Sequence, residues 1–270
     1  MKEDKNTKIL VGGIADGDSV KELLNTLERT EDKSFDDYII AYIDFLGVKK
    51  IMQNQDKNYD FLQIIQFLLN RTELVADVIH QQNSIKPFEV KIFSDNIVIA
   101  QKIEDELLEE QIIGIINIVW SLQFWALVQF GLFLRGGITV GELFINKDIV
   151  WGTGLIEAYN MENSLAVFPR VLVSKTVLAR YNESSDKTIN IEAFVDRDLD
   201  GMWFVDYMSA CVNLSVMPQV AESLKDTVKS FSEVDDRIKQ KINWTIRYFN
   251  SHCLKHKDRI EFDKCVIDYI

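Results

Sequence analysis

A stretch of 24 residues without a formal charge, Gln111 to Leu134, constrains the fold of this chain most. Its length would allow a helix to cross a bilayer. Asn117 and Ser121, however, lie four residues apart and therefore share one helix face. Gly131 then interrupts the helical pattern, and the run from Leu132 to Val140 is typical of a strand. We therefore predict a buried core helix followed by a central strand, with a membrane span as the alternative.

The overall composition is that of a globular protein with an excess of acidic residues. The 270 residues are 47% hydrophobic and include only 3 Pro and 12 Gly, which excludes collagen-like, low-complexity and mostly disordered chains. Lys and Arg total 30, Asp and Glu total 42, and the formal net charge is −12. A general basic surface for nucleic acid or anionic lipid is therefore not expected. An anionic ligand would need metal ions, backbone amides or a few chosen cations.

Cysteine usage and the N-terminus both favour a cytoplasmic protein. Cys211, Cys253 and Cys265 are odd in number, widely spaced and without a Cys-x-x-Cys pair. This pattern indicates a reducing compartment and argues against structural zinc. The segment from Met1 to Asp18 mixes charges with glycine and has no apolar h-region, so we expect no signal peptide and no direct membrane insertion.

The hydrophobic pattern mixes a hairpin with helical segments. Strands are predicted at 38–43, 88–93, 97–101, 132–144 and 170–174, and helices at 59–81, 152–164 and 175–181 in addition to the uncharged one. This order favours an α+β sandwich, in which helices pack on one face of a mostly antiparallel sheet.

Three regions are expected along the chain. Residues 1–36 form an N-terminal extension with a short helix near 19–27, and residues 37–207 form the main domain. Residues 208–270 form a helical C-terminal extension, because the pattern from about Ser215 is polar and helical.

Asp44 is the first candidate for chemistry. It follows a buried strand and precedes Phe45, Leu46 and Gly47, whose backbone amides are predicted to begin a helical stretch that runs to about Met52. Amides at a helix start accept anionic oxygens, and a carboxylate beside them can hold a divalent cation. The alternative is that Asp44 only caps the helix.

Asp95 and Arg135 add to this interpretation. Asp95 lies in the predicted hairpin turn Ser94-Asp95-Asn96. If this hairpin neighbours the first strand, Asp44 and Asp95 project from one sheet edge, where two carboxylates are costly unless protonated or bridged by cations. Arg135 interrupts an apolar strand and needs an anionic partner. The alternatives are a solvated turn aspartate and a structural ion pair.

Five segments in order resemble the motifs of class III nucleotidyl cyclases. They are 43–47, 91–95, 134–142, 151–162 and 170–174. The resemblance spans about residues 37–207 and implies that this region is a nucleotide cyclase catalytic domain with the ferredoxin-like sandwich of that class. The segments 93–96, 135–137, 169–170 and 200–207 are most similar to the stand-alone bacterial pyrimidine cyclases of the Pycsar antiphage defence system.

The resemblance implies roles for the residues at the sheet edge. Asp44 and Asp95 would bind two divalent cations, Mn²⁺ or Mg²⁺, with the Phe45 carbonyl as a further ligand. Arg135 would contact the terminal phosphates, and Phe45, Leu46 and Gly47 would line the substrate site. The implied reaction makes a 3′,5′-cyclic nucleotide and pyrophosphate from a nucleoside triphosphate, as a second messenger in antiviral defence. A downstream effector would sense the product.

The resemblance also implies a homodimer with composite active sites. Lys91 matches the base-reading position and would serve the site opposite to that of Asp95. Ile156 and Asn160 stand where purine cyclases hold the ribose and the transition state, and Ile149 stands where they read adenine. These changes favour a pyrimidine substrate, UTP before CTP. The alternatives are an adenylate or guanylate cyclase and a catalytically silent nucleotide-binding dimer.

Overall fold

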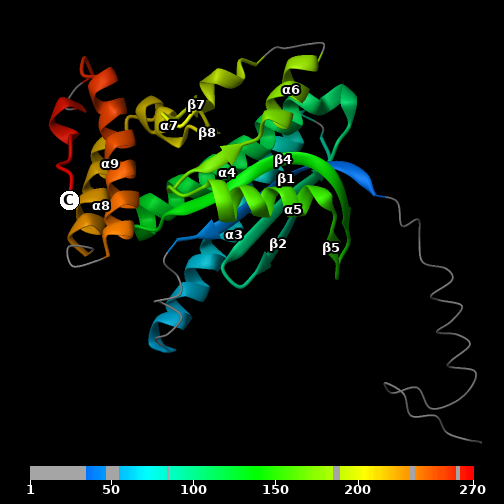
Figure 1. The fold of residues 1–270 in the computed structure, drawn as a ribbon, viewed down its shortest axis with the longest axis horizontal. Helices are drawn as coiled ribbons and strands as arrows, with labels where there is room; N and C mark the ends of the chain where they lie inside the picture. The colour runs from blue at the N-terminus through cyan, green and yellow to red at the C-terminus, as the bar shows by residue number, and fades with distance from the viewer. Residues whose placement is uncertain (1–34, 47–54, 84, 185–188, 231–234, 260–261) are drawn as a thin grey trace, which may run out of the picture. The chain divides into compact units, whose positions relative to one another are not determined.

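The computed structural model describes residues 35–46, 55–83, 85–184, 189–230, 235–259 and 262–270 (Figure 1). By its contacts the chain divides into two units, Met1–Phe35 and Asp36–Ile270. The first unit lies outside the described residues except for Phe35, so the short helix expected near 19–27 lies outside them too. The helical stretch expected from Gly47 to Met52 lies outside them as well. The second unit is described below.

A mixed sheet forms the centre of this unit. Among the described residues, seven strands run in the order β2-β3-β1-β4-β6-β8-β7, and an eighth, β5, pairs with the end of β4. They are β1 (Asp36–Phe45), β2 (Glu89–Phe93), β3 (Asn96–Lys102), β4 (Leu134–Ile145), β5 (Val150–Trp151), β6 (Val171–Val173), β7 (Val195–Arg197) and β8 (Trp203–Val205). In the described part of the chain every strand pair is antiparallel except β4 with β6. The expectation of a mostly antiparallel sheet is confirmed.

Helices complete an α+β fold, as the pattern predicted. They are α3 (Gln55–Asn83), α4 (Leu108–Phe130), α5 (Thr153–Asn160), α6 (Lys175–Glu183), α7 (Tyr207–Asn213), α8 (Met217–Ser230) and α9 (Asp236–Lys255). Short 3₁₀ turns η1 (Asp105–Leu107), η3 (Ile191–Ala193) and η4 (Phe262–Cys265) connect or follow them, and a π-helix, η2 (Met161–Leu165), extends α5.

Both faces of the central strand β1 are covered. Ile39 and Ile43 point into the main hydrophobic core with α3, α4 and α6, whereas Ile40 and Tyr42 point to the opposite face and cluster with Ala158 of α5. Burial on both faces explains the continuous apolar run in this strand. Helix α5 therefore packs on the opposite face of the sheet from α3, α4 and α6. The sequence predicted helices on one face only, and α5 departs from that prediction.

The long uncharged segment is the core helix that the sequence predicted. Its α4 portion ends at Gly131, which adopts a left-handed conformation (φ 61°) and donates its N–H to the carbonyls of Ala126 and Leu127. The segment Asp105–Phe130 is long and apolar enough to cross a membrane, but 78% of its most apolar window is buried inside the protein. Helix α4 therefore fills the core under the sheet.

The C-terminal helices pack around a second buried cluster. Figure 1 shows α8 and α9 lying next to each other beside the C-terminus. Trp244 and Tyr248, four residues apart on α9, stack with ring centroids 5.3 Å apart, and both belong to a cluster with Phe204 of β8. The contacts group residues 36–270 into one compact unit. They do not test the domain boundary expected between residues 207 and 208, which stays a prediction.

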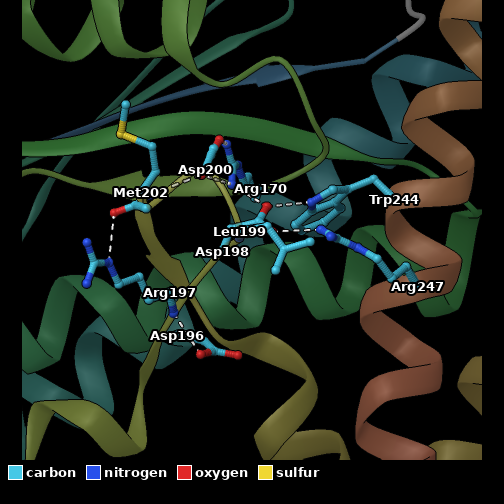
Figure 2. A network of polar contacts seen from close by, with 10 residues as sticks. Arg170, Asp196, Arg197, Asp198, Leu199, Asp200, Met202, Trp244 and Arg247 are labelled. Carbon is cyan, nitrogen blue, oxygen red and sulfur yellow. Dashed lines mark hydrogen bonds and ion pairs between the residues drawn. The ribbon is translucent and has the colours of Figure 1, made fainter.

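A buried arginine ties α9 to the sheet (Figure 2). Arg170 precedes β6, is fully buried, and pairs with Asp198 and Asp200 from the turn between β7 and β8. From α9, the indole N–H of Trp244 donates to Asp198 at 2.6 Å, and Arg247 pairs with the same carboxylate at 2.7 Å. Asp198 therefore links the helix, the turn and the sheet.

This network gives a prediction about stability. Replacing Arg170 by Met leaves Asp198 and Asp200 without their main partner, so we expect the free energy of unfolding to fall by about 3–5 kcal/mol. Arg180 and Asp37 form an exposed pair at 2.8 Å, and Arg180→Met should cost less than about 1 kcal/mol. Urea denaturation of both variants measures the difference; equal losses would show that the Arg170 network does not stabilise the fold.

Candidate functional site

Three neighbouring strands bring the predicted residues to one edge of the sheet. Asp44, near the end of β1, pairs in register with Asn96 of β3 on one side and with Arg135 of β4 on the other. Asp95 immediately precedes Asn96 in the hairpin turn, and its carbonyl accepts a hydrogen bond of 3.3 Å from the N–H of Phe45. Asp44, Asp95 and Arg135 therefore lie together, although 91 positions separate Asp44 from Arg135 in the chain.

Arg135 lies between two carboxylates. Its Nε donates to Asp44 Oδ2 at 3.0 Å, and its Nη2 lies 2.6 Å from Glu162 Oε1. Glu162 belongs to η2 and is only 4% exposed. The sequence analysis assigned Glu162 no role, although it is the last residue of the segment 151–162 that resembles a cyclase motif. We call Asp44, Asp95, Arg135 and Glu162 the strand-end cluster.

The carboxylates of this cluster are electrostatically coupled. Burial raises the pKa of Asp44, Arg135 lowers it through a hydrogen bond and its charge, and the charge of Asp95 raises it. Burial also raises the pKa of Glu162, which Arg135 lowers and Asp44 and Asp95 raise. One arginine thus offsets part of a negative charge spread over three acids. Such a group favours the arrival of further positive charge.

Two glycines after Arg135 make this arrangement possible. A Cβ on Gly136 would lie 2.2 Å from the carbonyl oxygen of Tyr42 in β1, so only glycine fits there. A Cβ on Gly137 would lie 2.5 Å from Cβ of Met161. The absence of a side chain at Gly137 lets the start of η2 lie against β4, and Glu162 thereby reaches Arg135.

Two of the three backbone amides predicted to bind phosphate already donate hydrogen bonds within the protein. The N–H of Phe45 donates to Asp95, as described, and the N–H of Leu46 donates to the carbonyl of Phe133 at 2.9 Å. Both amides therefore have backbone partners, which differs from the expectation of open amides at a helix start. Gly47, the third residue of that expectation, lies outside the described residues.

The residues expected to contact the base and the ribose lie on or beside β2, β5 and α5. Lys91 is on the edge strand β2, paired with Val98. Ile149 precedes β5 and Ile156 lies on α5, and each is 52% exposed; Asn160, at the end of α5, is exposed as well. In the described part of the chain none of these four makes a hydrogen bond or ion pair with the strand-end cluster. Asn160 nevertheless lies only two residues before Glu162 in the chain.

A second acidic group lies beside the C-terminal helices. Ligand atoms of Asp196, Asp206 and His252 lie within 4.8 Å of one another, a spacing that could hold a metal ion. Burial favours a higher pKa for Asp206, but hydrogen bonds from His252, Ser209 and Tyr248 lower it to about 2. Because Asp206 already accepts these bonds, the group resembles a structural ion pair more than an open metal site. The sequence analysis missed it because its members are distant in the chain.

Comparison with known proteins gives distant structural neighbours. No family model and no curated protein sequence matches the chain. The adenylyl cyclase CyaB from P. aeruginosa has 12% identity and a TM-score of 0.42, over 64% of this chain and 95% of that one. The guanylyl cyclase domain of the RhoGC fusion protein from Blastocladiella emersonii has 13% identity and a TM-score of 0.41, over 63% and 95%. Likeness of this degree does not assign an activity.

The close approach at Gly137 can be tested by stability. Gly137→Ala places a methyl group against Cβ of Met161, which cannot rotate away. We therefore expect a loss of about 1–3 kcal/mol in the free energy of unfolding. Gly114→Ala in α4 is the control, because its Cβ would meet only side-chain ends, the nearest at 3.0 Å, and alanine favours a helix by about 1 kcal/mol. Thermal or urea unfolding compares the two; an equal effect would contradict the proposed contact.

Proposed function

We propose that this chain is a metal-dependent nucleotide cyclase of class III that acts on a pyrimidine nucleoside triphosphate, UTP before CTP. The observation that carries the proposal is the strand-end cluster. Residues from four of the five segments that resemble cyclase motifs converge on it, namely Asp44, Asp95, Arg135 and Glu162. A functional site requires side chains from separate segments to meet at one place. Unrelated surface charges would have no reason to do so.

The donor set of the cluster fits divalent cations. Carboxylate oxygens are the ligands that Mg²⁺ and Mn²⁺ prefer. Burial, together with the charge of Asp95, raises the pKa values of Asp44 and Glu162, and a cation would offset both effects. Asp44 and Asp95 would hold the ions, with the Phe45 carbonyl as a further ligand. When bound, such ions lower the pKa of a ribose 3′-hydroxyl and neutralise a triphosphate.

Arg135 would position the phosphates. Its Nε and Nη2 are engaged by Asp44 and Glu162, which fixes the plane of the guanidinium. The remaining N–H groups can donate to a phosphate oxygen, and a pre-oriented donor loses little entropy on binding. Positioning and charge neutralisation are the main contributions that a protein makes to phosphoryl transfer.

A homodimer is part of the proposal. Lys91, Ile149, Ile156 and Asn160 make no polar contact with the cluster of their own chain, and a second copy could bring them to it. Large apolar side chains are exposed on the same elements, including Trp151 (65%) on β5 and Tyr159 (44%) on α5. Exposed apolar side chains grouped in this way favour an interaction surface.

The base and the biological role rest on the sequence resemblance. Ile149, at the position where the resemblance places the reader of adenine, is apolar, which supports a base other than adenine. An antiviral second messenger, a cytoplasmic location and a separate effector that senses the product belong to the same proposal. An adenylate or guanylate cyclase and a silent nucleotide-binding dimer are the competing functions.

The test is conversion of ATP, GTP, CTP and UTP by the purified protein with manganese. We expect UTP to give a 3′,5′-cyclic product and pyrophosphate, and Asp44→Asn to reduce the rate at least about a hundredfold. Asp77→Asn, an exposed carboxylate on α3, is the control and should keep the parent rate.

Each other outcome has a definite meaning. A cyclic purine product would replace the pyrimidine proposal by the adenylate or guanylate alternative. Nucleotide binding without pyrophosphate release would favour the silent dimer. If all four nucleotides stay unchanged and Asp44→Asn binds manganese as tightly as the parent, the cyclase proposal is rejected.

A further inference from the structure

Helix α9 of the C-terminal region lies close to the strand-end cluster. Ile242 of α9 is 1% exposed and belongs to the same buried cluster as Met161, the residue that precedes Glu162. Leu46, two residues after Asp44, packs against that cluster too.

Trp244 of α9 donates to Asp198, which pairs with Arg170, and the carbonyl of Arg170 accepts a hydrogen bond of 3.3 Å from the N–H of Gly136, the neighbour of Arg135. Helix α9 therefore lies beside the start of β4, and Lys241 precedes Trp244 by three residues, on the same side of the helix.

The side chain of Lys241 is positioned to bind an anion. Its side chain is partly buried, and within the described ranges it makes no hydrogen bond or ion pair. Burial lowers its pKa, the charge of Arg135 lowers it further, and Asp44 and Glu162 raise it. The lysine is therefore within electrostatic range of the cluster without being bonded to any member of it.

Two cations near one another repel unless an anion lies between them. Arg135 already has two carboxylate partners, whereas Lys241 has none in the described part of the chain. A multiply charged anion such as a polyphosphate would relieve the repulsion and use the lysine as a donor.

We infer that α9 supplies Lys241 to the strand-end cluster as a ligand of the terminal phosphates of a bound nucleoside triphosphate. This inference rests on the proposed function and deepens it, because it gives the C-terminal region a role in the site of its own chain. Lys241 and Arg135 would hold the phosphates from two sides, and the carboxylates would serve the metal ions.

The experiment measures binding of inorganic tripolyphosphate, with manganese, to the full-length parent and three variants by calorimetry. Lys241→Met should weaken binding about tenfold, the size expected when one charge-assisted hydrogen bond is lost. Lys241→Arg keeps the charge and should stay within about threefold of the parent. Lys239→Met is the matched control, because Lys239 is a partly buried lysine on a different side of the same helix.

Kinetics separate phosphate binding from a structural role. Lys241→Met should raise KM for the triphosphate about tenfold with a smaller change in kcat, as expected when a binding contact is lost. Its melting temperature should match that of Lys239→Met. If Lys241→Met and Lys241→Arg behave alike, or if the loss follows a lower melting temperature, the inference is overturned.

The outcomes distinguish this inference from the proposed function. If the parent turns over no nucleotide but binds tripolyphosphate through Lys241, the cyclase proposal fails and the inference stands. If the parent is active and Lys241→Met binds tripolyphosphate as Lys239→Met does, the inference alone fails. A parent that binds no tripolyphosphate overturns the inference.

Discussion

The ion pairs of Arg135 join β1, β4 and η2 at the edge of the sheet where the candidate site lies. One guanidinium on β4 joins Asp44 of the neighbouring strand to Glu162 of the π-helix on the other side. The pairing requires glycine at position 137, because a side chain there would displace the helix. With a partly buried arginine fixed, the acids around it can be held close in space at a tolerable electrostatic cost.

Ion pairs of a second arginine connect helix α9 to the same sheet. Arg170 binds Asp198, which α9 also binds through Trp244 and Arg247. Two arginines therefore mark the places where distant segments meet: the partly buried Arg135 at the strand-end cluster and the fully buried Arg170 beside α9. The two places are adjacent on the sheet, because the carbonyl of Arg170 accepts a hydrogen bond from the N–H of Gly136, next to Arg135.

Local sequence signals predicted the local structure well. The uncharged helix, the hairpin turn at Asp95 and the buried strand before Asp44 follow from hydrophobic period and turn residues, which act over a few positions. Glu162 and Lys241 escaped prediction because each reaches the site through packing between segments far apart in the chain. The placement of α5 was missed for the same reason, since it depends on which face of the sheet has room for a helix.

The account depends most on Asp44 and Asp95 acting together on divalent cations. Titration of manganese, followed by electron paramagnetic resonance, tests this directly in the parent and in Asp44→Asn, Asp95→Asn and the double variant. The account predicts that either single change weakens binding at least about tenfold and that the double change adds little to the worse of the two. Manganese binding that is unchanged in both single variants would contradict it.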